Sequence, residues 1–593
     1  MPMPKRNKQP DTSGLNTYFL KEKNKLPDCN VAWKLYEKGL DFNASINLNE
    51  TVQVNENFFI GKQWEGVVSN GLPTPVFNFL KRVACFTVAT ITSDNIKVNA
   101  VPLSSTANTQ ALVEPVRIVN EELDSLTELN NIPSLMREFA RNAAVDGDGC
   151  LYTWWDAEAE TGQDAKGRIR TEIVENTRVH FGNPNDRSVQ SQPWIILERR
   201  EMISAAQREA KENGFETWRT IGGDGDNTNP DAAKETTDKV TTLLLFWRDN
   251  DTGHIWAYKS ARGSSIREPW DLGINLYPIS WLNWDYIQDC FHGQAMITGL
   301  IPNQIFVNKI WAMSQLSMMT TAFPKVIYDR TRVHKWDNRI GAAIGVSGGD
   351  VNTVARIMDP ASISPQIAQF IQLATEQTEQ SLGATSVALG DTRPDNTSAI
   401  IALQRAASTP SEITKQNLYK SIEDLYRIYI EFMGEYYGTR TVDMTPPEEV
   451  RQAISFVGQA VPSQVPMPFD FGQLKEMPVH IKLDIGASSY YSEIASIQTL
   501  DNLLKMGKIS TTQYLDRIPD GYVPGRRELI DELREQERQM MAMQTGQMAQ
   551  GGQQLPEQQG IAGQEAMPEI PTGGGYSALQ RKVNETGTTE GMV

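Results

Sequence analysis

The sequence predicts an α+β fold in which strands and helices occupy separate stretches of the chain. Strand-like runs alternate with polar turns between residues 150 and 290, which is typical of β-strands joined by turns. Two later stretches, 297–316 and 418–436, repeat apolar residues every three or four positions, the spacing of one helix face. The length of 593 residues is the third observation, because at roughly 150 residues per domain it predicts about four domains.

Composition and charge exclude several classes of protein. Apolar residues make up 40% and charged residues 22%, which is enough apolar material for a sizeable core. No apolar run is long enough to cross a membrane, and no apolar stretch follows the charged first residues, so neither a membrane protein nor a signal peptide is expected. The formal net charge is −17. A simple nucleic-acid binder gathers Lys and Arg, so this chain either ignores nucleic acid or lies near it without binding tightly.

The cysteines and histidines indicate no metal or redox site. The four cysteines lie too far apart for zinc-ligand or redox-motif spacing and are predicted to be buried free thiols in a reducing cytoplasm. The five histidines form no HExxH or other paired motif, and there is no Walker-type phosphate loop. We therefore expect no metal, no cofactor and no ATP-driven activity.

One short motif suggests hydrolase chemistry. The segment Gly345–Gly349, GVSGG, matches the GxSxG pattern of a nucleophile elbow. That motif needs a strand before it, a helix after it and a histidine later in the chain, and only His480 follows. A flexible turn in a small β module is the favoured interpretation, and a serine hydrolase built on Ser347 is the alternative.

A second stretch is strongly acidic. Residues 121–160 hold ten Asp or Glu against Arg137 and Arg141. Paired carboxylates can perform acid–base catalysis, but the sequence shows no partner base or pocket. A solvated face of mutually repelling carboxylates is therefore expected.

The N-terminal quarter is expected to begin with a flexible arm. Residues 1–25 carry a net charge of +4, and residues 26–50 are expected to form a short helix and a turn. Residues 76–91 suit either a buried helix or two strands, because Val and Thr are frequent there. A helix is then predicted over Leu135–Val145, and Gly147 ends it.

Two helices are predicted on either side of a small β module. The first runs from about Gln294 to Thr321, and Pro302 either kinks it or resets its start. Residues 325–358 are short, strand-like and punctuated by glycine. The second helix spans Pro365–Leu382, with Ser364 as its N-cap.

The C-terminal part is expected to be mostly helical. After the loop 383–396, a long helix should reach about Tyr437 with a kink near Pro410. Residues 441–490 are interpreted as a proline-rich connector with one strand, Val479–Ile485, and everything after about residue 545 as disordered. One face of the long helix should be buried: Leu418, Ile422, Leu425, Tyr429, Phe432 and Tyr436. Further helices are predicted at Ser492–Met506, Ser510–Tyr514 and Arg526–Met541.

This order of elements resembles the portal proteins of tailed bacteriophages, the head–tail connectors. The resemblance rests on Phe59–Trp64, followed by Pro75 and Asn78, on His292-Gly293 before an apolar helix, and on Gly383–Ile400. The succession of helix, small basic β module, helix, glycine-containing loop and long kinked helix is its most specific feature. It covers roughly residues 50–540.

The resemblance implies one subunit of a ring, divided into named regions. In chain order these are an N-terminal arm (1–50), an α+β wing (51–292), a first stem helix (293–322), a clip (323–360), a second stem helix (361–383), a tunnel loop (384–396), a long kinked wing helix (397–440), a connector and helical crown (441–540), and a disordered tail rich in Gln, Met and Gly (541–593).

The resemblance also implies a structural function without catalysis. Family members form rings, commonly of about twelve subunits, at one capsid vertex. Duplex DNA passes through the ring during packaging and ejection without sequence-specific binding. The implied partners are further copies of the chain, the major capsid protein, the terminase, and later the head-completion or adaptor and tail proteins. The chain is then expected in the virion, and in the host cytoplasm during assembly, with no membrane. A minor capsid or adaptor protein is the alternative.

Two groups of residues are implied as functional sites. An acidic chain suits a conduit, because repulsion keeps the duplex from adhering to the channel, and the basic clip suits a docking surface. The implied channel residues of the tunnel loop are Val387, Leu389, Asp391, Arg393 and Asn396. The implied docking residues of the clip are Lys325, Arg330, Arg332, Lys335 and Arg339.

Overall fold

The structure is a computed structural model of the chain, and it confirms a mixture of helices and sheets. It forms two compact units, Met1–Ala495 and Ser496–Val593, which are described separately. The residues that the structure describes are 27–93, 96–102, 109–163, 165–224, 238–322, 326–337, 339, 343–357, 366–381, 411–444, 465–477, 479–485, 490–518, 526, 529–530 and 532–533.

Three helices open the described part of the chain, and local residues set their ends. The Asp28 carboxylate accepts a hydrogen bond at 2.9 Å from the backbone N–H three residues later, and the side chain of Asn78 caps the third helix in the same way. Gly61 ends the second helix at φ 97°, a conformation that favours glycine. Of the two structures expected for residues 76–91, the helix is correct. The helices are α2 (Cys29–Ser45), α3 (Leu48–Ile60) and α4 (Phe79–Ile91).

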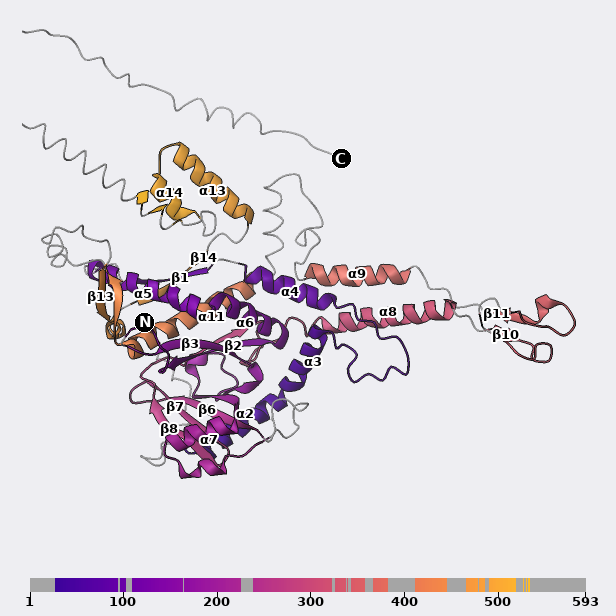
Figure 1. Ribbon diagram of the computed structural model, residues 1–593, viewed down its shortest axis with the longest axis horizontal. Helices are drawn as coiled ribbons and strands as arrows, with labels where there is room; N and C mark the ends of the chain where they lie inside the picture. Colours follow the sequence, from indigo (N-terminus) through magenta and orange to yellow (C-terminus); the bar gives the residue numbers. More distant parts are fainter. Residues whose placement is uncertain are drawn as a thin grey trace, which may run out of the picture. The chain divides into compact units, whose positions relative to one another are not determined.

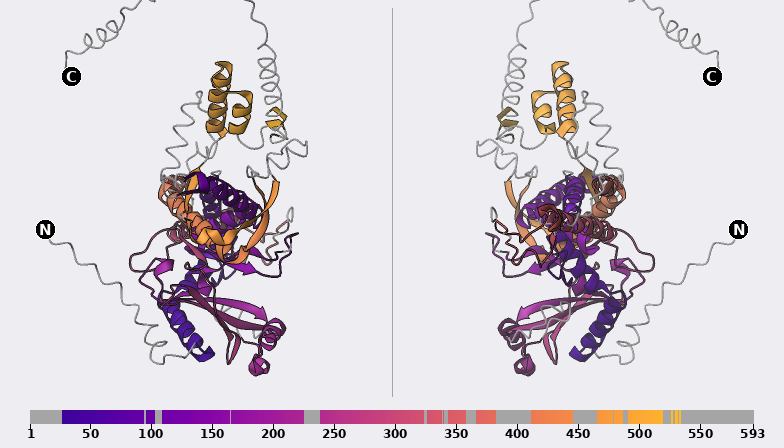
Figure 2. Two further views of the ribbon diagram at one scale, coloured as in Figure 1. Left: turned by 90° about the vertical axis from the view of Figure 1, so that its left-hand side faces the viewer. Right: turned by 90° about the vertical axis from the view of Figure 1, so that its right-hand side faces the viewer.

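A five-stranded antiparallel sheet follows the chain order, and α2 packs on it. Trp194 pairs across the strands with Trp247, and Trp247 pairs with Trp256. Directly opposite residues share a face, so three indoles line the face against which Leu35 and Tyr36 of α2 pack. Figures 1 and 2 show α2 beside this sheet. The elements are β4 (Val179–Phe181), β5 (Trp194–Met202), α7 (Ile203–Glu212), β6 (Lys239–Arg248), β7 (Ile255–Ala261) and β8 (Ser264–Asp271).

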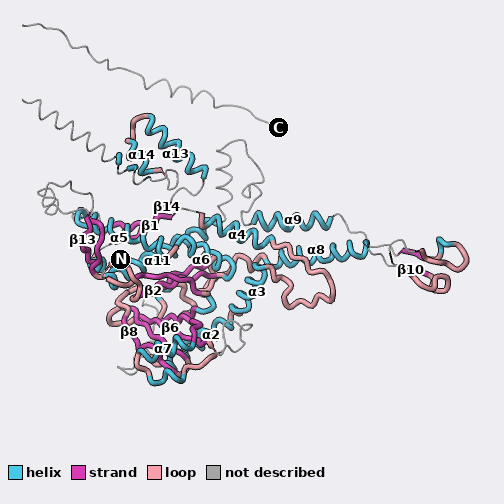
Figure 3. Tube along the Cα trace, in the orientation of Figure 1, coloured by secondary structure: helices cyan, strands magenta, loops and turns pink. Residues whose placement is uncertain are grey.

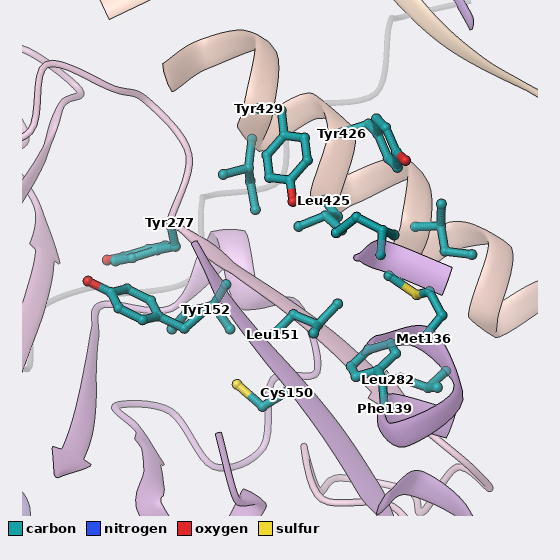
Figure 4. Close-up of a cluster of buried hydrophobic side chains, with 14 of the residues drawn as sticks. Met136, Phe139, Cys150, Leu151, Tyr152, Tyr277, Leu282, Leu425, Tyr426 and Tyr429 are labelled. Atoms are coloured by element: carbon teal, nitrogen blue, oxygen red, sulfur yellow. The ribbon is translucent and has the colours of Figure 1, made fainter. Parts of the chain in front are cut away.

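The larger hydrophobic core lies between a three-stranded antiparallel sheet and the helices packed on it. Figure 4 shows Leu151 of the central strand close to Met136 and Phe139 of one helix and Leu425 of another. All four side chains are buried. The sheet has the order β3 (Arg168–Val174), β2 (Asp148–Asp156), β9 (Ile279–Asn283), and the helices are α5 (Thr109–Leu129), α6 (Ile132–Asp146) and α11 (Glu412–Phe432).

Helix α11 confirms the predicted apolar stripe at five of its six positions, whereas Tyr436 lies beyond the helix and is only partly buried. Leu418, Ile422, Leu425, Tyr429 and Phe432 are all buried in the larger core. The helix ends in a π-helical turn, Met433–Tyr437. Its predicted upstream part, with the kink near residue 410, lies outside the described residues.

Two small sheets join distant segments. Strand β1 (Ile96–Pro102) pairs antiparallel with β14 (Val479–Ile485), so the strand predicted there is confirmed and its partner lies far away in the sequence. Strand β12 (Thr439–Met444) pairs with β13 (Val465–Asp470). The expectation of a single strand in the connector is therefore wrong. The prolines of β13 are compatible with a two-stranded sheet, because each strand there has one unpaired edge.

The chain order helix, two short strands, helix is the order predicted (Figures 1 and 3). The elements are α8 (Ile301–Ala322), β10 (Val326–Tyr328), β11 (Ala355–Ile357) and α9 (Gln366–Ser381). The first helix begins at Ile301 and not at Gln294. Pro302 therefore resets the start, since proline is tolerated in the first turn of a helix but not in its interior.

The C-terminal unit is described only in part. Helix α13 (Tyr490–Lys505) leads into it, and α14 (Thr511–Arg517) follows. Ser510 and Gln513 form a reciprocal capping box at the start of α14. Leu515, Ile518 and Ile530 make a small apolar cluster. Most of the third predicted helix, at residues 526–541, lies outside the described residues.

Candidate functional site

Helix α8 combines an apolar surface with exposure. It contains one charged residue, Lys309, in 22 residues. Its first turns are buried through Ile301, Val307 and the polar side chains of Gln304 and Asn308. Large apolar side chains gathered on an exposed surface mark a contact site, so the rest of α8 is a candidate for such a contact. The exposed large apolar side chains are Phe306, Met313, Leu316, Met318 and Met319, at 38–62% exposure.

Helix α9 lies along α8 (Figure 1). The Asn303 side-chain amide of α8 donates a hydrogen bond to the Thr378 hydroxyl of α9 at 3.1 Å. On α9, Phe370 and Leu373 are more than half exposed. The pair of helices thus leaves apolar side chains of both members uncovered within the described part of the chain.

The segment between the two helices has a small core of its own. Strands β10 and β11 pair over three residues each, and Val333 and Val354 are buried. The rings of Tyr328 and Trp336 stack with their centroids 5.2 Å apart. This is the β module that the sequence predicted.

Arg332 holds the loop of this module in place. Its guanidinium donates to the Gly348 carbonyl at 2.9 Å, to the Thr353 hydroxyl at 3.2 Å and to the Asp350 carbonyl at 3.2 Å. Gly348 and Gly349 have φ of 74° and 80°, and a Cβ on Gly349 would collide with that guanidinium. Gly348 and Gly349 of the GVSGG motif are thus explained by a turn and a close approach.

A buried carboxylate fixes the chain that leads to α8. Asp148 accepts hydrogen bonds from the Asn283 amide at 2.7 Å, the Gly293 backbone N–H at 2.7 Å and the His292 Nδ1 atom at 2.6 Å. Asp148 and His292 are both at most 2% exposed. The backbone at Gly293 also lies against that of Gly147, where a Cβ would lie 3.0 Å from the Gly147 carbonyl. His292-Gly293 therefore marks a packed junction and not the start of the helix.

The acidic stretch 121–160 is not simply a solvated face, which corrects the expectation. Burial raises the pKa of Glu122, whose carboxylate accepts a hydrogen bond from a tyrosine hydroxyl at 2.9 Å. Burial and the neighbouring Glu56 carboxylate raise the pKa of Asp146 to about 8. Carboxylates of this stretch are thus used inside the fold.

A polar cavity of about 600 Å³ lies beside Asp146. The residues that line this cavity also include Glu56, Arg141, Glu175 and Arg178. Arg141 forms a bidentate ion pair with Glu56, with one Nη2–Oε2 distance of 2.6 Å, so the two charges balance within the chain. Nowhere in the described ranges do three or more His, Cys, Asp or Glu gather as a metal site.

The expected docking residues differ in the hydrogen bonds and ion pairs that they form. Arg332 is engaged inside the module, and Arg339 pairs with Asp337 at 2.6 Å. Arg330 and Lys335 are exposed and form no hydrogen bond or ion pair with other described residues. Lys325 lies outside the described residues, as do all five tunnel-loop residues, Val387, Leu389, Asp391, Arg393 and Asn396.

A comparison with family models decides the family. The model described as "Phage P22-like portal protein" matches residues 180–572, about two thirds of the chain. The chain belongs to this portal family. It is therefore a structural connector of a phage particle and a component of the virion.

Comparisons with individual proteins do not strengthen the family assignment. A comparison with curated proteins finds no match. A solved structure titled "Neck of empty GTA particle computed with C6 symmetry" is similar at 10% identity, over 73% of this chain and 88% of that chain, with a TM-score of 0.33. A likeness this weak carries no argument, so the family assignment rests on the family model.

The portal chain lacks the local geometry of a hydrolase elbow at Ser347. Residues 343–350 contain neither strand nor helix, and a 3₁₀ turn, Val351–Thr353, follows. The Ser347 backbone N–H donates to the Arg332 carbonyl at 3.0 Å. The motif requires a strand before the serine and a helix after it, so the described residues do not support this alternative.

Other expectations for the portal chain have mixed outcomes. All four cysteines are free thiols, but Cys85 is exposed and only Cys150 is fully buried, so burial was predicted wrongly for most of them. Among the described helices, none is both long and apolar enough to cross a membrane. The Asp148 junction was missed, because its partners are far apart in the sequence. The exposed face of α8 had a detectable signal, namely its near absence of charge.

Proposed function

We propose that this portal chain assembles with copies of itself into a ring at one capsid vertex, and that duplex DNA passes through the ring during packaging and ejection. The exposed apolar surface of α8 carries the proposal. In a closed ring each subunit offers two different faces to its neighbours, which suits a helix whose large apolar side chains are left exposed in the single chain.

The composition of α8 supports a protein–protein contact. Interfaces are enriched in Met and aromatic residues and depleted of Lys, Glu and Asp at their centres. The uncovered part of α8 contains Met313, Met318 and Met319 together with Phe306, and its only charge is Lys309. We assign the first stem helix (293–322) and the second stem helix (361–383) to this contact.

Charge supports a conduit that does not grip DNA. Tight phosphate contacts would slow a sliding duplex, and they require clustered Lys and Arg. The chain has a net charge of −17. The charged residues of α8 and α9 are Lys309, Glu376 and Glu379. The tunnel loop (384–396) is proposed to face the channel. We assign the motor to a partner, the terminase, and no catalytic role to this chain.

The clip (323–360) is proposed as the docking site for the terminase and then for head-completion and tail proteins. Arg330 and Lys335 support this assignment, because their charges are exposed and are not matched by described residues. Exposed charges at an interface chiefly steer the encounter between partners. The wing (51–292), the long wing helix (397–440) and the crown (441–540) are assigned to the body of the ring, which the major capsid protein would surround.

Light scattering on the full-length protein, with negative-stain images of the same sample, tests the ring. A ring of twelve copies of 66.3 kDa would have a mass of about 800 kDa and a central hole. The variant Met313→Glu should shift this species to smaller masses, whereas Ile413→Glu, a similar change at another exposed apolar residue, should not. Wild-type protein that stays monomeric both alone and when co-expressed with capsid proteins would contradict the proposal.

A further inference from the structure

The loop between α3 and α4, residues 61–78, is anchored to α8 at its base. The Asn308 amide of α8 donates to the Gln63 side-chain carbonyl at 2.6 Å. The Gln304 amide of α8 donates to the Phe77 carbonyl at 2.7 Å. These four residues join both ends of the loop to the first turns of the helix, and Figure 3 shows the loop running beside α8.

Contacts within the loop hold its base in one conformation. The Trp64 indole N–H donates to the Pro75 carbonyl at 2.9 Å and closes the loop across its width. The Asn78 amide donates to the carbonyls of Phe58 and Phe59 at 3.2 and 2.9 Å. The base of the loop is therefore tied to both α3 and α8.

The tip of the loop is apolar and uncovered. No charged residue occurs between positions 66 and 80. Val67, Val68 and Leu72 are 55%, 81% and 53% exposed. Asn70 and Gly71 form a turn at φ 48° and 81°, closed by a hydrogen bond from the Leu72 N–H. Burying such side chains against another apolar surface stabilises a contact, and long ordered loops of this kind usually have a function.

The exposed surface of the loop continues onto α8. Phe77 stacks on Trp311 of α8 with the ring centroids 4.4 Å apart, and Phe77 itself is half exposed. Phe306 of α8 is also half exposed. Loop and helix thus share one feature, uncharged aromatic and aliphatic side chains open to solvent, which is typical of the centre of a protein interface.

We propose that the tip of this loop, Val67–Leu72, packs against an adjacent copy of this chain. The inference rests on the proposed ring, because the copy that covers α8 is the copy that the loop would meet. We infer that the loop tip contacts a second copy of this chain because the loop is hydrogen-bonded to α8. In the proposed ring, the exposed apolar side chains of α8 are covered by that copy. The loop therefore acts as a strap that extends the contact between subunits beyond the stem helices.

A double substitution in the full-length protein tests the strap. Val68→Glu with Leu72→Glu places two carboxylates where apolar contact is expected and should raise the protein concentration needed for ring assembly at least about tenfold. Both side chains are exposed, so circular dichroism and thermal unfolding of the subunit should not change. The matched control is Val113→Glu, at an exposed valine of α5, which should assemble as the wild type does.

A photo-crosslinking amino acid at position 68 identifies the occupant. In purified wild-type rings it should produce covalent dimers of the chain, with the partner site mapped by mass spectrometry. Rings that form normally with both glutamates, or crosslinks found only to a different particle protein, would overturn the strap and leave the ring proposal intact. A wild-type chain that never forms rings would overturn both, and the mass measurement alone detects that case.

Discussion

Replacing Asp148 by alanine should destabilise the wing where the chain leaves it towards α8. The substitution removes one buried acceptor group that serves three donors at 2.6–2.7 Å, the buried His292 and the partly buried Asn283 and Gly293. A buried donor that loses its partner costs about 1–3 kcal/mol. Since the three share one site and relax together, we expect a loss of about 3–5 kcal/mol, at the lower end of what three separate losses would sum to.

Thermal unfolding followed by tryptophan fluorescence measures this loss. The Trp281 ring lies 5.8 Å from the His292 ring, so the emission should report on the junction. A domain of this size loses roughly 2–4 °C per kcal/mol, so Asp148→Ala should lower the transition by about 10 °C. Asp148→Asn keeps one acceptor oxygen and should lose less.

A matched control separates burial from charge. Asp156 pairs with Arg170 at 2.6 Å, but the Arg170 side chain is 51% exposed. Exposed ion pairs contribute about 0–1 kcal/mol, so Asp156→Ala should be nearly neutral. If Asp148→Ala unfolds within about 1 kcal/mol of the wild type, or no earlier than Asp156→Ala, the hydrogen bonds of the junction do not stabilise the fold as argued.

A pH titration tests the buried carboxyl of Asp146. Its folded-state pKa of about 8 lies above the ordinary 3.8, so its stabilising contribution is complete at low pH and is lost as the pH rises through the folded value. Relative to Asp146→Asn, the unfolding free energy should fall by up to about 1.4 kcal/mol per unit between about pH 4 and 8, and parallel profiles would refute this. Arg332→Ala should make the loop of the clip more sensitive to limited proteolysis. The double variant Arg330→Glu with Lys335→Glu should weaken binding of the terminase or adaptor, with the largest effect at low salt, while the ring stays intact. Unchanged affinity in the double variant would remove the docking proposal. Deleting Val387–Asp395 should leave rings intact and impair packaging or DNA retention, and a failure to form rings would show that this loop is structural.

The sequence alone predicted those parts of the candidate site that depend on local signals. The β module between two helices follows from residue spacing, glycine content and proline position, which act over a few residues. The sequence could not distinguish Arg332 from Arg330, two positions apart. The Arg332 guanidinium donates hydrogen bonds to the carbonyls of Gly348 and Asp350. Only the folded loop brings those carbonyls close to Arg332.

The same distinction holds for the whole chain. Local patterns predicted many of the helices, the strands between residues 150 and 290 and most of the buried stripe of α11, because backbone propensity and apolar spacing are properties of short segments. The pairing of β1 with β14, the contact of Asp148 with His292 and the burial of Asp146 were decided by the tertiary structure. Each joins segments that are distant in the sequence or depends on what packs around a side chain. Their energies arise from burial, which a linear pattern does not contain.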